Sequence, residues 1–217
     1  MANLPHPDTR DLPAILPHTA LLFIDVQNYC ARRDGSEFAH MSPAQFDREL
    51  GWFFDTFERE TLPNMQKLQA GCRKAGVEVM YTIIRNLTAD GRDRSLDYKI
   101  TGFNVPPDSF DGQVLDAIRP GPDEMVIPKT SSNVFVSTNI DYVLRNLSTK
   151  HLVISGIVTD QCVASATMTA CDLGYLVTLV TDACATYTQE RHDNTLRAIK
   201  GYCRQRTTAE FLAEIGG

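Results

Sequence analysis

The sequence predicts an α/β protein with a single domain, built as a three-layer sandwich around a mostly parallel, doubly wound sheet. Two patterns lead to this prediction. Short apolar runs of strand length alternate along the chain with longer segments whose apolar residues recur every three or four positions, which is typical of parallel strands joined by helices. The short runs are apolar at consecutive positions, which indicates strands buried on both faces.

The chain divides into an N-terminal arm over 1–18, rich in Pro, Asp and His, and one domain over 19–217. A chain of this length can build one full hydrophobic core. In order, the domain is expected to contain a strand (20–25), a helical stretch (44–75), a strand (77–84), a short helix (114–118), a strand (124–129), a helix (137–147), a strand (152–155), a helix (162–173), a strand (175–180), a helix (188–199), a short strand (206–208) and a helix from 209.

Residues that start or stop helices set the boundaries of these elements. Pro63 has no backbone N–H, so the helical stretch is expected to divide into two helices or to kink there. Gly76 and Gly174 each follow a helical segment and can adopt the left-handed conformation that ends a helix. Ser137 or Thr138 is expected to cap the N-terminus of the helix that follows.

Composition disfavours several classes of partner and location. The net charge of −6 argues against nucleic acid and anionic membranes as partners. No apolar run approaches the roughly 20 residues that span a bilayer. The first residues lack the basic start and apolar stretch of a signal peptide, so a cytoplasmic location is expected. The Gly-rich phosphate loops of nucleotide-binding proteins are absent from the sequence.

The six cysteines do not form a recognisable metal-binding or redox motif. No pair has C-x-x-C spacing, and no cysteine belongs to a Cys/His cluster of the zinc-binding type. In a cytoplasmic chain, each cysteine is expected to be reduced, small and buried. The sequence therefore predicts neither a metal site nor a cofactor.

Three reactive residues fall at or just after the carboxyl ends of expected strands: Asp25, Lys129 and Cys162. These ends lie side by side at one edge of a parallel sheet, so the three side chains are expected to converge. A nearby lysine and a helix N-terminus both favour the thiolate form of a cysteine. Asp25 can accept the thiol proton and later return it to a leaving amine. The combination predicts acyl transfer through a covalent intermediate.

Each of these features also has an ordinary structural explanation. An aspartate at a strand end often caps the next helix, a lysine after proline is usually exposed, and most cysteines at helix starts are simply buried. A non-catalytic binding protein of the same fold is therefore the alternative. The polar segment over 85–111 begins at another strand end and is expected to cover the site, with a plain solvent-exposed loop as the alternative.

The sequence resembles the isochorismatase-like cysteine hydrolases over roughly residues 18–212. The resemblance rests on three motifs, Phe-Ile-Asp25-Val-Gln-Asn, Val-Ile-Pro-Lys129 and Gly156-Ile-Val-Thr-Asp-Gln-Cys162-Val. It implies that Asp25 is the general base, that Lys129 is its partner and that Cys162 is the nucleophile.

The same resemblance implies a cis peptide bond between Ile157 and Val158, and an oxyanion hole made by the N–H groups of Val158 and Cys162. Nicotinamidases of the family carry an Asp-x-His metal site after the second strand. This chain has Arg85 and Asn86 there and no nearby histidine, so a metal and nicotinamidase activity are disfavoured. True isochorismatases lack the nucleophilic cysteine, so Cys162 argues against their reaction.

The substrate expected from the resemblance is a small linear ureide, cleaved with release of ammonia. Biuret and triuret hydrolases are the nearest likeness, and triuret hydrolase is the narrowest assignment. Ureidoacrylate and N-carbamoyl amino acids are the alternative substrates. A ureide needs matched hydrogen-bonding groups in its pocket. The polar residues expected to supply them are Gln27, Asn28, Arg85, Asn86, Ser131, Ser132, Asn133 and Gln205.

The resemblance also implies a partner, because members of the family commonly form dimers or tetramers. A homo-oligomer is therefore expected. The aromatic residues over 46–57 are expected either to pack inside the chain or to cover part of a subunit interface.

Overall fold

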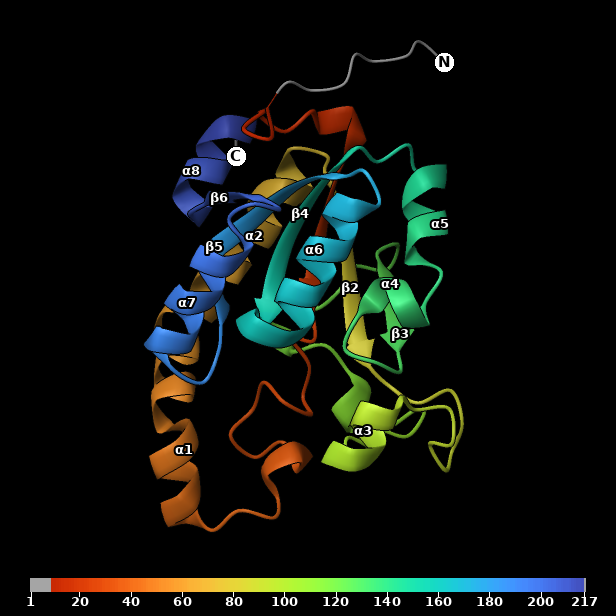
Figure 1. The fold of residues 1–217 in the computed structure, drawn as a ribbon, viewed down its shortest axis with the longest axis vertical. Coiled ribbons are helices and arrows are strands. Elements are labelled where there is room, and N and C mark those ends of the chain that lie inside the picture. The colour runs from red at the N-terminus through yellow and green to blue at the C-terminus, as the bar shows by residue number, and fades with distance from the viewer. Residues whose placement is uncertain (1–8, 217) are drawn as a thin grey trace.

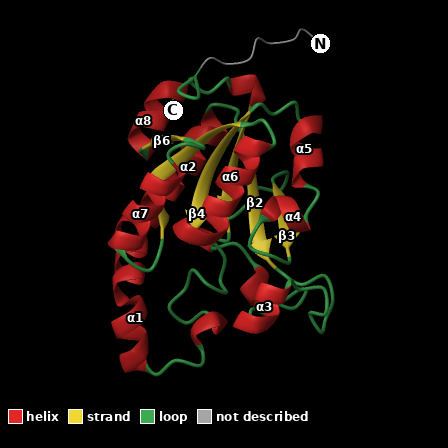
Figure 2. Ribbon diagram, viewed as in Figure 1, coloured by secondary structure: helices red, strands yellow, loops and turns green. Residues whose placement is uncertain are grey.

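The structure is a computed structural model that describes residues 9–216. Its strands form one sheet in the order β3-β2-β1-β4-β5-β6, with every neighbouring pair parallel (Figures 1 and 2). This confirms the predicted parallel, doubly wound sheet. The strands are β1 (Thr19–Ile24), β2 (Glu78–Ile84), β3 (Met125–Lys129), β4 (His151–Ile157), β5 (Leu176–Ala185) and β6 (Arg204–Arg206).

Helices cover both faces of the sheet. One hydrophobic cluster joins the sheet to α1, α2 and α8, and a second joins it to the helices from α4 to α7. Figure 1 shows α6 in front of the sheet and α2 behind it. The helices are α1 (Pro43–Thr56), α2 (Leu62–Lys74), α3 (Leu96–Thr101), α4 (Val134–Ser137), α5 (Ile140–Asn146), α6 (Ala164–Asp172), α7 (Gln189–Ile199) and α8 (Thr208–Ile215).

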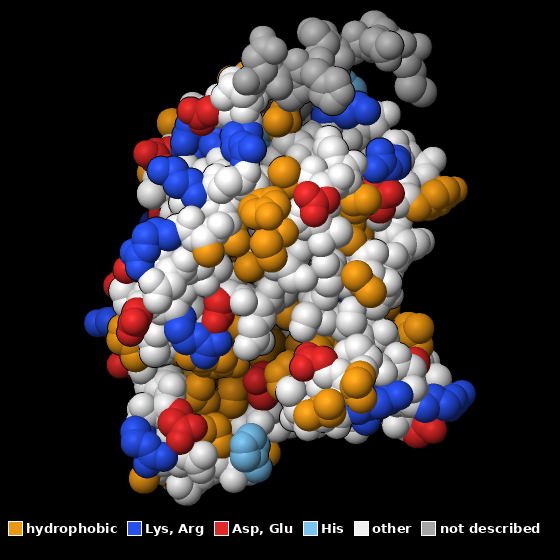
Figure 3. Space-filling view, in the orientation of Figure 1, with side chains coloured by type: hydrophobic (Ala, Val, Ile, Leu, Met, Phe, Trp, Pro, Cys, Tyr) orange, Lys and Arg blue, Asp and Glu red, His pale blue; other side chains and the backbone are white. Residues whose placement is uncertain are grey.

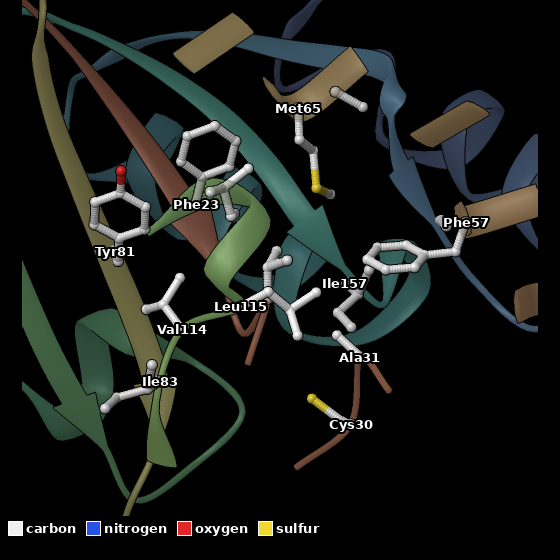
Figure 4. Close-up of a cluster of buried hydrophobic side chains, with 14 of the residues drawn as sticks. Phe23, Cys30, Ala31, Phe57, Met65, Tyr81, Ile83, Val114, Leu115 and Ile157 are labelled. Atoms are coloured by element: carbon white, nitrogen blue, oxygen red, sulfur yellow. The ribbon is translucent and has the colours of Figure 1, made fainter. Parts of the chain in front are cut away.

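The central strand β1 is buried on both faces, as its continuous apolar sequence predicts. Leu21 and Phe23 point to the cluster that includes α1 and α2, and Leu22 points to the opposite cluster. Figure 4 shows Phe23 in the first cluster, together with Met65 of α2 and Phe57. Phe53, Phe54 and Phe57 are therefore packed inside the chain, whereas Trp52 in the same stretch is exposed.

Pro63 marks a change of helix type rather than a break. The backbone stays helical from α1 to α2 through one π turn, Phe57–Thr61. The N–H of Leu62 donates to the carbonyl of Phe57, five residues back. The wider turn leaves Pro63 in the first turn of α2, where a missing N–H costs little.

Several expected elements differ from the structure in their bounds, and β5 continues to Ala185 where the expected strand ends at residue 180. Only residues 116–118 of the expected helix 114–118 form a 3-10 turn, because Val114 is used in an antiparallel bridge to Gln27. The expected helix 137–147 is split into α4 and α5, because the backbone is extended at Thr138. The last strand is 204–206 instead of 206–208, because Thr207 already caps α8.

The N-terminal arm is described only in part. Residues 1–8 of the expected arm lie outside the described residues, and Leu16–His18 forms a 3-10 turn that leads into β1. Over residues 9–216, no helix has the length and hydropathy needed to cross a membrane.

At Gly156 the backbone of β4 lies very close to that of β1. A Cβ atom added there would lie 2.3 Å from the carbonyl oxygen of Ile24, and the φ angle of Gly156 is +140°. Gly156→Ala is therefore expected to lower the free energy of unfolding by about 3 kcal/mol or more, through backbone strain and overpacking. Urea unfolding followed by circular dichroism measures the change.

Gly51→Ala is the matched control for this prediction. Gly51 lies in α1, and an added Cβ atom would meet no atom within 4 Å. This variant is expected to stabilise the protein by roughly 0.5–1 kcal/mol, because glycine is a poor helix residue. Equal effects of the two substitutions would contradict the close approach of β1 and β4.

Candidate active site

Asp25, Lys129 and Cys162 meet at the carboxyl edge of the sheet. Asp25 follows β1, Lys129 ends β3, and Cys162 lies in the turn between β4 and α6. The chain order along the sheet reverses between β1 and β4, and a crevice forms at such a point in open α/β sheets. Asp25 and Cys162 lie on the two sides of this crevice.

Lys129 holds the three groups together. Its side chain is fully buried, and its Nζ lies 2.8 Å from Oδ2 of Asp25 and 3.4 Å from Sγ of Cys162. The same Nζ donates to the hydroxyl of Tyr98 at 2.7 Å and to the carbonyl of Ser131 at 3.0 Å. β3 and β1 are separated by β2, a spacing of about 10 Å, so a long side chain is needed to reach Asp25.

Asp25 is buried where the chain turns out of β1. Its backbone is left-handed with a φ angle of 58°, a conformation that aspartate adopts more readily than most residues. Its N–H donates to the carbonyl of Thr82 at 3.0 Å. Burial raises the pKa of Asp25, while the charge of Lys129 and hydrogen bonds from Lys129 and Cys162 oppose the rise. The resulting carboxylate is a stronger base than an exposed aspartate.

Cys162 is buried, and its burial favours the protonated thiol. It belongs to the π turn Thr159–Val163 ahead of α6 and is 5 % exposed. Burial raises its pKa to about 12, although the nearby charge of Lys129 lowers it. The lysine favours the thiolate and desolvation opposes it. Asp25 is within hydrogen-bonding reach of the thiol, as its expected role as a proton acceptor requires.

Two backbone features lie beside the thiol. The peptide bond between Ile157 and Val158 is cis, at the position where the resemblance implies such a bond. Val158 and Cys162 both line the cavity next to Asp25. Their N–H groups as an oxyanion hole stay a prediction.

The cavity beside Cys162 is small and opens into a larger cleft. The inner cavity holds about 30 Å³, and the outer cleft about 770 Å³. Glu37, Phe103 and Tyr187 line both spaces and form the neck between them. Figure 3 shows the molecule hollowed between α1 and α3, where hydrophobic and acidic side chains gather.

The segment over 85–111 contributes directly to the site. It contains the short helix α3, from which the buried Tyr98 contacts Lys129, and Phe103 in the neck. The ring of Phe103 packs against the rings of Tyr98 and Tyr29. These contacts agree with the expected role as a cover.

None of the eight polar residues expected to bind substrate lines the inner cavity. The amide of Gln27 is buried and bonds to both backbone groups of Ile84 and to the carbonyl of Asp111. The amide of Asn28 bonds to the carbonyl of Phe110. These two amides satisfy the backbone of neighbouring segments instead of facing a ligand.

The remaining six polar residues either form hydrogen bonds within the protein or lie outside both spaces. Asn86 bonds to Asn104, Asn133 caps α4 and bonds to Thr169, and Gln205 bonds to the carbonyl of Leu196. Ser131 contributes its carbonyl to Lys129. Arg85 and Ser132 are half-buried and lie outside both the inner cavity and the outer cleft.

Sequence reasoning missed the other residues that line the cavity with Asp25, Ile157, Val158 and Cys162. These are chiefly Cys30, Glu37, Phe53, Phe103 and Tyr187. Most come from loops or from the ends of helices, where no periodicity predicts the direction of a side chain. The one available signal was the position of residues 85–111 after a strand end.

The described part of the chain offers no evident metal site. Within residues 9–216, no three His, Cys, Asp or Glu side chains are grouped so that they could hold a metal ion.

The fold agrees with what sequence and structure comparisons find. The family model described as the Isochorismatase domain matches residues 19–211. Ureidoacrylate amidohydrolase RutB of Rhizobium rhizogenes (strain K84) is 27% identical over 181 residues, which cover 76% of this chain and 69% of that protein. N-carbamoylsarcosine amidase of an Arthrobacter species is 34% identical over 107 residues, which cover 47% of this chain and 40% of that protein.

The fold has close counterparts among solved structures. A cysteine hydrolase from Pseudomonas syringae pv. phaseolicola 1448A superimposes with a TM-score of 0.76 over 94% of this chain and 95% of that one, at 21% identity. The family model spans β1 to α8 and includes Asp25, Lys129 and Cys162. The chain therefore belongs to the isochorismatase family, within the isochorismatase-like hydrolase superfamily.

Proposed function

We propose that the protein is a cysteine amidohydrolase that cleaves a C–N bond of a small linear ureide and releases ammonia. The observation that carries the proposal is the buried contact of Lys129 with both Asp25 and Cys162. A cation in contact with a carboxylate and a thiol, beside one small cavity, supplies the groups needed for nucleophilic acyl transfer.

The reaction proceeds in two steps. Asp25 takes the proton of Cys162, and Sγ attacks the terminal carbonyl of the ureide. The negative oxygen is stabilised by the N–H groups of Val158 and Cys162. Asp25 returns the proton to the leaving nitrogen, so ammonia departs and an S-acyl enzyme remains. Water, deprotonated by Asp25, then breaks the C–S bond, which releases the carboxylated product and restores the thiol.

We infer biuret or triuret as the substrate, with triuret as the narrower choice. Hydrolysis of triuret at one end gives carboxybiuret and ammonia. Ureidoacrylate and N-carbamoyl amino acids are the second candidates, and they are favoured by the names of the relatives described above. Nicotinamide is the least favoured of the candidate substrates. We also propose that the protein is cytoplasmic, forms a homo-oligomer and needs no cofactor.

Ammonia release from a panel of amides tests the proposal. Purified protein is incubated with biuret, triuret, ureidoacrylate, an N-carbamoyl amino acid and nicotinamide, and ammonia is measured for each. Cysteine-dependent release from any ureide supports the reaction class, and the ranking of kcat/KM identifies the substrate. Specific binding of the ureides without any turnover would instead favour a non-catalytic binding protein.

The pH dependence of kcat/KM is expected to report the ionisation of Asp25. Its pKa is raised above the ordinary value of 3.8, and the base must be ionised to act. kcat/KM is therefore expected to be high above the pKa of Asp25 and to fall about tenfold per pH unit below it. The fall should begin at a higher pH than for an exposed aspartate.

The titratable groups around Asp25 are Lys129, Cys162, Glu37, Cys30 and Tyr98. Lys129 stays cationic, because the charge of Asp25 raises its pKa despite burial. A parallel profile of Glu37→Gln separates the titration of Glu37 from that of Asp25. An acid limb centred below pH 4 in both proteins would contradict a buried aspartate base.

A further inference from the structure

Glu37 lies where the inner cavity and the outer cleft of the site meet. It lies in the 3-10 turn Ser36–Phe38, which connects β1 to α1, and it lines both the inner cavity and the outer cleft. Phe38, the next residue, is buried and packs against the rings of Phe46 and Phe54. The turn is thus anchored to the core, and Glu37 is held at the neck by its neighbours.

The inner cavity contains acids but no cation. Its lining includes Asp25 and Glu37, and no Lys, Arg or His is among its lining residues. Over residues 9–216, Glu37 forms no ion pair, whereas Asp25 is paired with Lys129. A carboxylate that entered this cavity would lose its hydration without gaining a counter-charge, which is unfavourable.

The arginines of the outer cleft are already engaged. Arg191 is paired with Asp160 and lies over the ring of Tyr187, and Arg48 is paired with Glu49. Neither residue lines the inner cavity.

The size of the cavity decides which part of a substrate meets Glu37. A water molecule needs about 10–15 Å³ of such space, so 30 Å³ accommodates a group of about the size of one carbamoyl unit. The unit that reacts with Cys162 fills this space. The next group of the substrate then lies in the neck, between Glu37, Phe103 and Tyr187. In a ureido acid that group leads to the carboxylate, and in biuret or triuret it is a second carbamoyl unit.

We propose that Glu37 determines substrate class, because its carboxyl group binds the second carbamoyl unit of an uncharged ureide and disfavours ureido acids. This inference rests on the proposed function and narrows its substrate. A carboxyl group can accept hydrogen bonds from the N–H groups of the ureide. Phe103 and Tyr187 line the same neck and offer aromatic surface to a planar ureide.

The ionisation of Glu37 agrees with this role. Burial and the charge of Asp25 raise its pKa to about 8, while hydrogen bonding to Tyr187 opposes the rise. A carboxyl group that is mostly protonated at neutral pH has one O–H donor and one carbonyl acceptor. This pair complements the carbonyl and N–H of a carbamoyl unit.

Two substitutions of Glu37 test the inference by kinetics. Glu37→Met removes both hydrogen-bonding atoms and is expected to raise the KM for biuret and triuret about tenfold, with kcat changed much less. Glu37→Gln restores a donor and an acceptor and is expected to recover most of the lost affinity. The ratio of kcat/KM for triuret over ureidoacrylate should be at least about 100 in the wild type and fall about tenfold in Glu37→Met.

Glu190→Gln is the matched control, because Glu190 is an exposed acid in the first turn of α7 that lines neither space. It should leave the substrate ratio unchanged. A wild type that prefers ureidoacrylate, or an unchanged KM in Glu37→Met, would overturn the role of Glu37 while leaving the amidohydrolase proposal intact.

Binding to the Cys162→Ser protein tests Glu37 without turnover. Calorimetry should show that biuret and triuret bind more tightly than ureidoacrylate, and that Glu37→Met added to Cys162→Ser removes this preference. Absence of a preference would overturn the inference. If the preference is found but the wild type releases no ammonia, the inference holds and the proposed reaction fails.

Discussion

Replacing Cys162 by serine is expected to lower kcat for ammonia release by about 10⁴-fold or more. The hydroxyl of serine is a much weaker acid than a thiol, and the same buried cavity that raises the pKa of Cys162 to about 12 gives no added help to an alkoxide. The fold should stay intact, because the two side chains differ by one atom. Single-turnover and steady-state ammonia assays measure the loss, and circular dichroism checks the fold.

Cys171→Ser is the control for this substitution. Cys171 lies in α6, the helix that follows the turn of Cys162, and is only half-buried. This variant should keep wild-type kcat. Full turnover by Cys162→Ser would show that the thiol is not the nucleophile and would end the proposed mechanism.

Replacing Lys129 by methionine is expected to reduce both stability and activity. Methionine fills a similar space but leaves the carboxylate of Asp25 buried without its cation. Removing one partner of a buried ion pair costs about 3–5 kcal/mol of unfolding free energy. kcat/KM should fall about 10³-fold or more, because an unpaired buried Asp25 takes up a proton and no longer acts as a base.

The loss of stability in Lys129→Met should depend on pH with a defined sign. Without the lysine, burial raises the pKa of Asp25 further above its value in the unfolded chain. A carboxyl group whose pKa is higher in the folded state stabilises that state only while it is protonated. Stability is therefore lost as pH rises through the folded-state pKa. Urea unfolding at pH 5 and pH 8 should show the larger deficit at pH 8.

A double variant separates charge imbalance from loss of chemistry. Asp25→Asn combined with Lys129→Met removes both charges, and asparagine tolerates the left-handed backbone at this position. The double variant should regain much of the lost stability and remain inactive. A Lys129→Met protein as stable as the wild type at pH 8 would mean that Asp25 and Lys129 are not a buried ion pair.

The sheet and the convergence of Asp25, Lys129 and Cys162 could be predicted from the sequence, because both depend on patterns that reach across many residues. Continuous apolar runs identify buried parallel strands, and a parallel sheet brings its strand ends to one edge. The structure places the three side chains in contact at that edge. Their chemical roles remain predictions.

The lining of the cavity could not be predicted in the same way. Gln27 and Asn86 are polar and adjacent to strand ends, yet the amides of both are buried and already hydrogen-bonded to other parts of the protein. Sequence position places a residue near an edge, but it does not say whether the backbone nearby already needs its amide. Glu37 was missed because it lies in an irregular loop, away from any strand end.

The burial of Cys162 shows a further limit of sequence reasoning. A lysine and a helix start favour a thiolate, and both are present. The degree of burial, which decides the competition between charge and desolvation, depends on side chains from distant segments such as Phe53 and Tyr187. Only the assembled structure gives that information.

The close approach of Gly156 to Ile24 has a consequence for proton transfer. The base and the cation belong to the half of the sheet formed by β1, β2 and β3, and the thiol belongs to the half formed by β4, β5 and β6. The two halves join only where β1 pairs with β4. A slip of one residue along that seam is about 3.3 Å, comparable with the contact between Lys129 and Cys162. Gly156 has no side chain and takes no part in the chemistry, yet its tight fit against Ile24 fixes the spacing across which the proton must move.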